Sequence, residues 1–133
     1  MRIPHDKGLL GHSDGDVLLH AISDAVLGAA GLEDIGFHFP DNDESIEGIE
    51  SGRILARAVD LARSKGLTVV NIDAVVVCEE PKIQPHREEM RRAIARIMAV
   101  DAARINVKGK TTEGLGFAGR RQGIESYAVC LLE

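Results

Sequence analysis

The stretch GLLGHSDGDVLLHAISDAVLGAAGL, residues 8–32, decides the fold of this chain. Ser13 and Asp14 are residue types that cap helix N-termini, because a side-chain oxygen can accept a free first-turn amide. Gly31 stands where a left-handed residue ends a helix. Most residues between these two points are apolar, so the pattern predicts a helix over about 14–30 that is buried on several sides.

One polar stripe runs along this predicted helix. Asp16, His20 and Asp24 follow an i, i+4 spacing, which brings them to one face. His12 and Ser13 lie at the N-terminal end, where free amides and the helix dipole favour an anion. The stripe predicts a reactive site in which carboxylates support imidazoles. The alternative is that His12 is a capping residue and His20 an ordinary core histidine paired with a carboxylate.

The remaining elements follow from periodicity and from Gly and Pro positions. We expect a short strand before residue 7, a polar loop over 33–43 in which Phe37 and Phe39 pack down, helices over 51–65 and 86–98, and strands over 67–78, 103–108 and 123–132. This order predicts an α+β fold with a single small mixed sheet covered on one face by helices. At 133 residues the chain is expected to form one domain, residues 1–133.

Composition excludes several classes of protein. The net charge is −5 and aromatic residues make up 3%, which argues against a nucleic-acid surface. No run approaches the roughly 18 apolar residues of a membrane helix. Without a signal-peptide pattern the chain is expected to be cytoplasmic, or stromal in a plastid-bearing source. In that compartment Cys78 and Cys130 are predicted to be buried thiols rather than a disulfide.

A Gly-rich loop predicted over residues 109–120 carries the second group of candidate residues. Lys110, Thr111, Thr112 and Glu113 combine a cation, hydroxyl and amide donors for phosphate, and a carboxylate for Mg²⁺. The stretch is not a P-loop, because the GxxxxGK[ST] pattern is missing. Taken alone, the stretch is weak evidence for a phosphate site, and an ordinary Gly-rich connection between strands explains it better. An acidic chain that binds an anionic ligand would need divalent cations at the site.

Three motifs, in the same order along the chain, resemble the methylerythritol cyclodiphosphate synthases of the non-mevalonate isoprenoid pathway. They are HSDGDVLLHAISDAVLGAAGLEDIGFHFPDND at 12–43, EEPKIQPH at 79–86 and NVKGKTTEGLGFAGRRQGI at 106–124. The resemblance implies a lyase that converts 4-diphosphocytidyl-2-C-methyl-D-erythritol 2-phosphate into the 2,4-cyclodiphosphate and CMP. It also implies a homotrimer of a ferredoxin-like variant with active sites between subunits, and the cofactors Zn²⁺ and Mg²⁺ or Mn²⁺.

The resemblance also implies roles for individual residues. His20 matches a zinc ligand, Glu113 matches the ligand of the second metal, and His12 and Thr111 match the residues that stabilise the transition state. The positions that match the methylerythritol-phosphate pocket are Ser13, Asp34, Ile35, Gly36, Phe39, Pro40, Asp41, Asn42 and Asp43. Those that match the cytidine-diphosphate pocket of the adjoining subunit are Cys78, Glu79, Glu80, Pro81, Lys82, Ile83, Gln84, Lys110, Thr111, Thr112 and Glu113. Phe117 and Arg120 match positions near the trimer axis.

One departure from the family pattern bears on zinc. The family begins with a strand that carries an Asp-x-His pair and supplies two zinc ligands, and no such pair occurs here. We expect that this sequence begins downstream of that strand, which would leave a sheet edge exposed. The alternative is a zinc-deficient, non-catalytic trimer that binds a cytidine nucleotide or an isoprenoid phosphate.

Overall fold

The computed structural model describes residues 13–38, 49–77, 86–110 and 125–133. In these ranges four α-helices, one short 3₁₀-helix and three strands follow one another. They are α1 (Ser13–Ala29), α2 (Ile35–His38), α3 (Ile49–Ser64), β1 (Val69–Val77), α4 (Arg87–Met98), η3 (Ala102–Arg104), β2 (Ile105–Lys110) and β3 (Glu125–Leu132). The short strand predicted before residue 7 lies outside the described residues.

The ends of α1 and α3 are set by glycines, as the sequence predicts. Gly31 has a φ of 73° and Gly66 a φ of 80°, which side-chain-bearing residues adopt at a cost. Behind Gly31 the Leu32 amide donates to the Leu27 carbonyl at 2.8 Å, and so satisfies one of the last free carbonyls of α1. The Lys65 ammonium donates to the Ala30 carbonyl at 2.7 Å, which ties the end of α3 to the end of α1.

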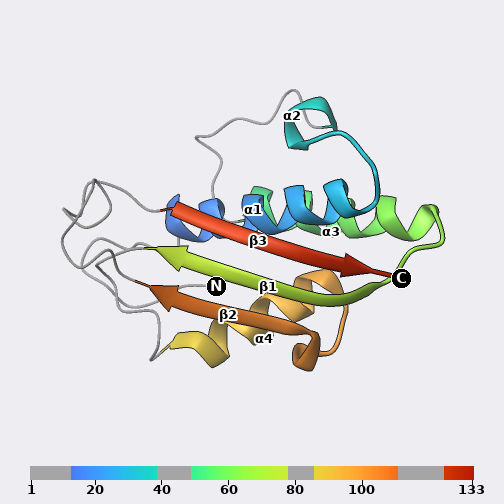
Figure 1. Ribbon diagram of the computed structural model, residues 1–133. Coiled ribbons are helices and arrows are strands. Elements are labelled where there is room, and N and C mark those ends of the chain that lie inside the picture. The colour runs from blue at the N-terminus through green and yellow to red at the C-terminus, as the bar shows by residue number, and fades with distance from the viewer. Residues whose placement is uncertain (1–12, 39–48, 78–85, 111–124) are drawn as a thin grey trace.

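The sheet has the order β2-β1-β3 and is mixed, as predicted. β1 runs parallel to β2 and antiparallel to β3. Figure 1 shows the helices on one side of the sheet, where α1 and α4 lie against the strands and α3 packs on α1 and α4. On the other side Tyr127, Val129 and Leu131 of β3 are 59%, 71% and 59% exposed. The predicted α+β fold, with one face covered by helices, is therefore confirmed.

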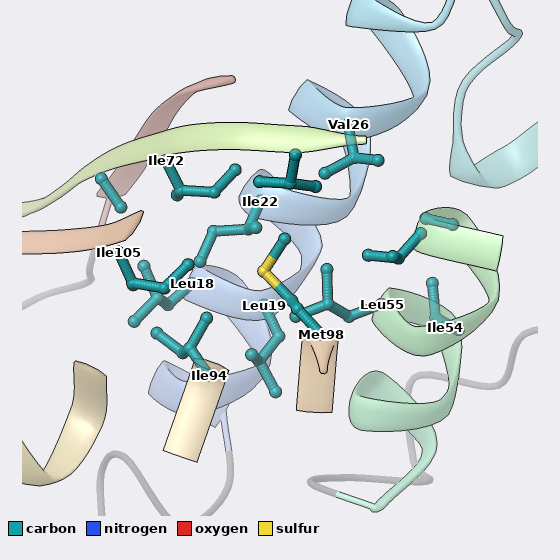
Figure 2. Packing of buried hydrophobic residues seen from close by; sticks show 14 of the residues in the cluster. Leu18, Leu19, Ile22, Val26, Ile54, Leu55, Ile72, Ile94, Met98 and Ile105 are labelled. Carbon is teal, nitrogen blue, oxygen red and sulfur yellow. The ribbon is translucent and has the colours of Figure 1, made fainter. Parts of the chain in front are cut away.

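The core lies between the sheet and the three long helices (Figure 2). Its side chains come from every layer and are almost completely buried; they include Leu18, Ile22, Val26, Ile54, Leu55, Ile72, Ile94, Met98 and Ile105. Each such side chain contributes about 1.5–3 kcal/mol when it leaves water. Because α1 contacts both the sheet and α3, it needs apolar residues on several sides, which explains its unusual composition.

Three expectations about local structure differ from what the structure shows. The predicted loop over 33–43 contains one helical turn, α2, because two carboxylates satisfy the amides of that turn. Phe37 does not pack down and is 66% exposed. Gly109 and Lys110 belong to β2 rather than to the Gly-rich loop, because their backbones pair with Val76 and Val77 of β1.

Candidate active site

The candidate site lies at the edge of the sheet where β1 and β2 end. Val77, the last residue of β1, is in register with Lys110, the last residue of β2, and with Glu125, the first of β3. Neighbouring strands are about 4.8 Å apart, so these three chain positions are close together. The two stretches predicted to hold the nucleotide directly follow Val77 and Lys110 in the sequence. In Figure 1 the N-terminal ends of α1 and α4 lie at the same end of the molecule.

A polar network on the open face of the sheet keeps β1 and β2 in this register. Asp73 Oδ2 pairs with the Lys108 ammonium at 3.0 Å, and Asp73 Oδ1 accepts from the Asn106 amide at 3.1 Å. Arg87 at the start of α4 donates to Asn106 Oδ1 at 2.5 Å and to the Val107 carbonyl at 2.8 Å. The sequence shows these polar residues alternating with apolar ones, but that pattern does not reveal which of them meet.

His20 makes a contact that sequence reasoning missed. Its Nε2 lies 3.1 Å from the hydroxyl oxygen of Ser51, which is the third residue of α3 and is 1% exposed. Asp24 is expected from the sequence to support an imidazole on this face, but it forms no hydrogen bond or ion pair with His20. It is exposed, and its Oδ1 accepts from the Ile35 amide at 2.9 Å instead. The side chain of Asp16 lies outside the described residues.

Two carboxylates shape the turn that carries the predicted residues Asp34, Ile35 and Gly36. Asp24 binds the Ile35 amide, and Asp34 Oδ1 accepts from the Phe37 amide at 3.0 Å. The side chain of Ile35 is buried in the core. A Cβ at Gly36 would lie 3.4 Å from Asp34 Oδ1, which is an ordinary van der Waals contact. The turn thus presents an exposed carboxylate on a fixed backbone.

The structure describes only part of the predicted site. Ser13 begins α1, His20 lies in its middle, Asp34, Ile35 and Gly36 are at α2, and the exposed Lys110 ends β2. The other predicted residues lie outside the described residues; they are His12, Phe39, Pro40, Asp41, Asn42, Asp43, Cys78, Glu79, Glu80, Pro81, Lys82, Ile83, Gln84, Thr111, Thr112, Glu113, Phe117 and Arg120. Within the described ranges, no three His, Cys, Asp or Glu side chains gather to hold a metal ion.

Cys130 lies half-buried in β3 and, in the part of the chain that the structure describes, forms no disulfide. Burial raises the pKa of its thiol to about 11, because the thiolate would lose its hydration. The thiol is therefore protonated at neutral pH and a poor nucleophile. Cys78 lies outside the described residues.

A model of the YgbB family matches residues 1–133. The 2-C-methyl-D-erythritol 2,4-cyclodiphosphate synthase of Geotalea uraniireducens is 56% identical over 131 residues, which are 98% of this chain and 83% of that relative. The chain belongs to the YgbB family. The resemblance carried by the three motifs is confirmed. Several curated relatives carry this same name, which supports the conclusion that the chain is an enzyme with the synthase function in isoprenoid biosynthesis. The non-catalytic alternative is not favoured.

Solved structures from the YgbB family's synthases share the fold. A Plasmodium falciparum IspF structure in complex with CDP aligns with a TM-score of 0.80 and 35% identity, over 99% of this chain and 87% of that one. The bifunctional IspDF from Campylobacter jejuni aligns with a TM-score of 0.83 and 43% identity, over 92% of this chain and 33% of that longer protein. None of the helices in the described ranges has the length and apolar character needed to cross a membrane.

Proposed function

We propose that the chain, as a single domain over residues 1–133, converts 4-diphosphocytidyl-2-C-methyl-D-erythritol 2-phosphate into the 2,4-cyclodiphosphate and CMP. The observation that carries the proposal is the 56% identity to a synthase of this name over 98% of the chain. In this reaction an oxygen of the 2-phosphate attacks the β-phosphorus of the diphosphate. The bond from that phosphorus to the bridging oxygen breaks, and CMP leaves with the electron pair. In such a phosphoryl transfer the protein mainly has to position the reacting groups and to stabilise the charge of the transition state.

The cytidine diphosphate is proposed to bind where β1 and β2 end. Cys78 to Gln84 follow Val77, and Thr111 to Glu113 follow Lys110, and these two strand ends are in register. Lys110 is exposed at this edge, so its ammonium can meet a phosphate oxygen. A CDP complex of the similar Plasmodium falciparum protein supports a cytidine nucleotide as the ligand.

The methylerythritol phosphate is proposed to bind beside the start of α1 and the α2 turn. Ser13 stands at the N-terminus of α1, where free amides favour a phosphate. Asp34 is exposed and uses one carboxylate oxygen to hold the Phe37 amide, so the second oxygen can accept substrate hydroxyls. Phe39 to Asp43 complete this proposed pocket.

The family resemblance predicts that two divalent cations bind, zinc at His20 and Mg²⁺ or Mn²⁺ at Glu113. An imidazole whose other nitrogen lies against a protein oxygen is a usual metal ligand, and His20 next to Ser51 has this arrangement. When bound, the cations would supply positive charge that neutralises phosphoryl oxygens. His12 and Thr111 are proposed to donate hydrogen bonds to the charge that develops during transfer.

A homotrimer with active sites between subunits is also part of the proposal. Tyr127, Val129 and Leu131 form an apolar row on the open face of the sheet, and burial of such a row favours association with another copy. Phe117 and Arg120 are proposed to lie near the three-fold axis. Sedimentation equilibrium should report a mass about three times that of the 14.3 kDa chain.

The decisive experiment measures CMP release from the cytidine substrate in the presence of Zn²⁺ and Mg²⁺. We expect release that depends on the chain, and a much lower rate for His20→Ala. As a control, Arg57→Ala removes an exposed charge on α3 that is outside the proposed site. Tight CDP binding by calorimetry with no CMP release would instead favour the non-catalytic binder.

A further inference from the structure

We propose that Asp73 is a specificity-determining residue of the nucleotide site, because it neutralises Lys108 and leaves Lys110 as the cation that β2 offers to phosphate. This role rests on the proposed function, since it takes the end of β2 as the place where the cytidine diphosphate binds. It goes further in naming the residue that sets how many phosphates the site prefers. Asp73 does not touch the nucleotide and acts through Lys108.

Lys108 and Lys110 lie on the same face of β2, and only one of them is paired. Side chains two residues apart in a strand point the same way and are about 7 Å apart, so the two ammonium groups are close enough to serve one ligand. The Lys108 ammonium instead pairs with Asp73 Oδ2 at 3.0 Å. Lys110 is exposed, and none of the ion pairs among the described residues involves it.

The register of the sheet shows in which direction the Lys108 side chain extends. Asp73 of β1 is level with Asn106 of β2. Lys108 is two residues further along β2, towards the end of that strand. The pairing with Asp73 therefore directs the Lys108 ammonium back along the strand, away from Lys110 and from the proposed phosphate site.

The protein holds the Asp73 carboxylate at both of its oxygens. Oδ1 accepts from the Asn106 amide at 3.1 Å, while Oδ2 accepts from the Lys108 ammonium. Asn106 is itself held by Arg87, which donates to its Oδ1 at 2.5 Å. The ion pair remains partly exposed, at 39% for the Asp73 side chain and 44% for that of Lys108. A pair this exposed adds little to stability, so its main effect is on where positive charge is available.

The charge available at the end of β2 follows from this pairing. The charges of Asp73 and Lys108 cancel, and Lys110 alone attracts phosphate. A neutral side chain at residue 73 would release the Lys108 ammonium as a second cation within the roughly 8 Å over which charges act at physiological ionic strength. A second cation favours the ligand that carries more negative charge. Asp73 thus keeps the site matched to a nucleoside diphosphate rather than to a triphosphate.

The test compares Asp73→Asn with two matched variants of the whole chain. Asp60→Asn makes the same change in net charge at an exposed position of α3. The double variant Asp73→Asn with Lys108→Met removes both charges of the pair, so it keeps the net charge of the unaltered chain. Calorimetry measures the affinities for CMP, CDP and CTP. Carbon-13 NMR of the lysine side chains reports which ammonium group responds to CDP.

In the unaltered chain CDP should shift the signals of Lys110 and leave those of Lys108 unchanged. Asp73→Asn should bind CDP about 2- to 5-fold more tightly, the usual range for one exposed charge, and the gain should be larger for CTP and smaller for CMP. Asp60→Asn and the double variant should bind all three nucleotides like the unaltered chain. Because the double variant also lacks Asp73, its normal binding would separate neutralisation of Lys108 from a purely structural role.

Three results would each overturn this role of Asp73: a shift of Lys108 by CDP in the unaltered chain, no rise in the ratio of CTP to CDP affinity in Asp73→Asn, or a double variant that binds like Asp73→Asn. The first result is read from the unaltered chain, so it holds even if a variant folds poorly. A chain that binds no CDP would overturn the role as well.

CMP release tests the synthase proposal separately. The expected binding results without any CMP release would reject the synthase reaction and leave the role of Asp73 standing. CMP release from a chain in which CDP shifts Lys108 would do the reverse.

Discussion

Asp24 Oδ1 accepts a hydrogen bond from the Ile35 backbone amide at 2.9 Å, and so ties the body of α1 to the turn of α2. Asp34, which begins that turn, is the residue proposed to accept substrate hydroxyls. Asp24 therefore holds a substrate-binding turn in place, although it was first expected to support a histidine. Asp24 fixes the position of the turn, because its carboxylate binds the backbone of the turn and not the proposed substrate.

The first prediction concerns this contact. Asp24→Ala removes the acceptor and should cost about 1 kcal/mol of unfolding free energy, the typical net value of one hydrogen bond, because Asp24 is exposed. The loosened turn should raise KM for the cytidine substrate several-fold while CDP affinity stays nearly unchanged. Urea unfolding, steady-state kinetics and calorimetry measure the three quantities. Asp60→Ala, at an exposed position of α3, serves as the control. An equal loss of CDP affinity would contradict the assignment.

The second prediction concerns Ala99, which follows α4 with a φ of 57° and is the only non-glycine residue of the described ranges with a positive φ. An L-residue with a side chain pays about 1–2 kcal/mol in this conformation relative to glycine. Ala99→Gly should therefore raise the unfolding free energy by roughly 1 kcal/mol after the extra chain entropy of glycine is subtracted. Calorimetric melting measures the shift. Ala103→Gly, at an exposed residue of η3, should lower the melting temperature instead.

The third prediction concerns Arg87, which donates from α4 to the Asn106 side chain and to the Val107 carbonyl of β2, an edge strand of the three strands that the structure describes. Arg87→Ala should lower the unfolding free energy by about 1–2 kcal/mol, because two charge-assisted hydrogen bonds are lost. Amide exchange should also speed up in β2. Arg92→Ala is the comparison, since Arg92 is exposed on the same helix. If both variants exchange at the same rate, Arg87 does not hold the strand.

The fourth prediction is a pH dependence at Cys130, because burial raises the pKa of its thiol from the ordinary 9.0 to about 11. The folded state binds this proton more tightly than the unfolded state does. The stability due to the protonated thiol is therefore fully present below pH 9 and is lost as the pH rises from about 9 towards 11. Urea unfolding between pH 8 and pH 11 should show this loss, and Cys130→Ala should reduce it. A variant that loses stability over this range as steeply as the unaltered chain would exclude Cys130 as its source.

Local patterns in the sequence were sufficient to predict the helices, the strands and the family. The apolar run of α1, the glycines at Gly31 and Gly66, and the alternation in β1 each act over a few residues, so they can be read without the fold. The three motifs also name most of the proposed site, since they are contiguous stretches.

Packing of distant segments accounts for what those patterns did not reveal. Ser51 contacts His20 because α3 packs on α1. Asp24 binds the Ile35 amide because α2 packs against α1. Lys110 belongs to β2 because its backbone pairs with Val77 of β1. These partners are 31, 11 and 33 residues apart in the sequence. Since no short-range periodicity relates residues at such separations, their contacts depend on how the hydrophobic core sets the helices and strands against one another.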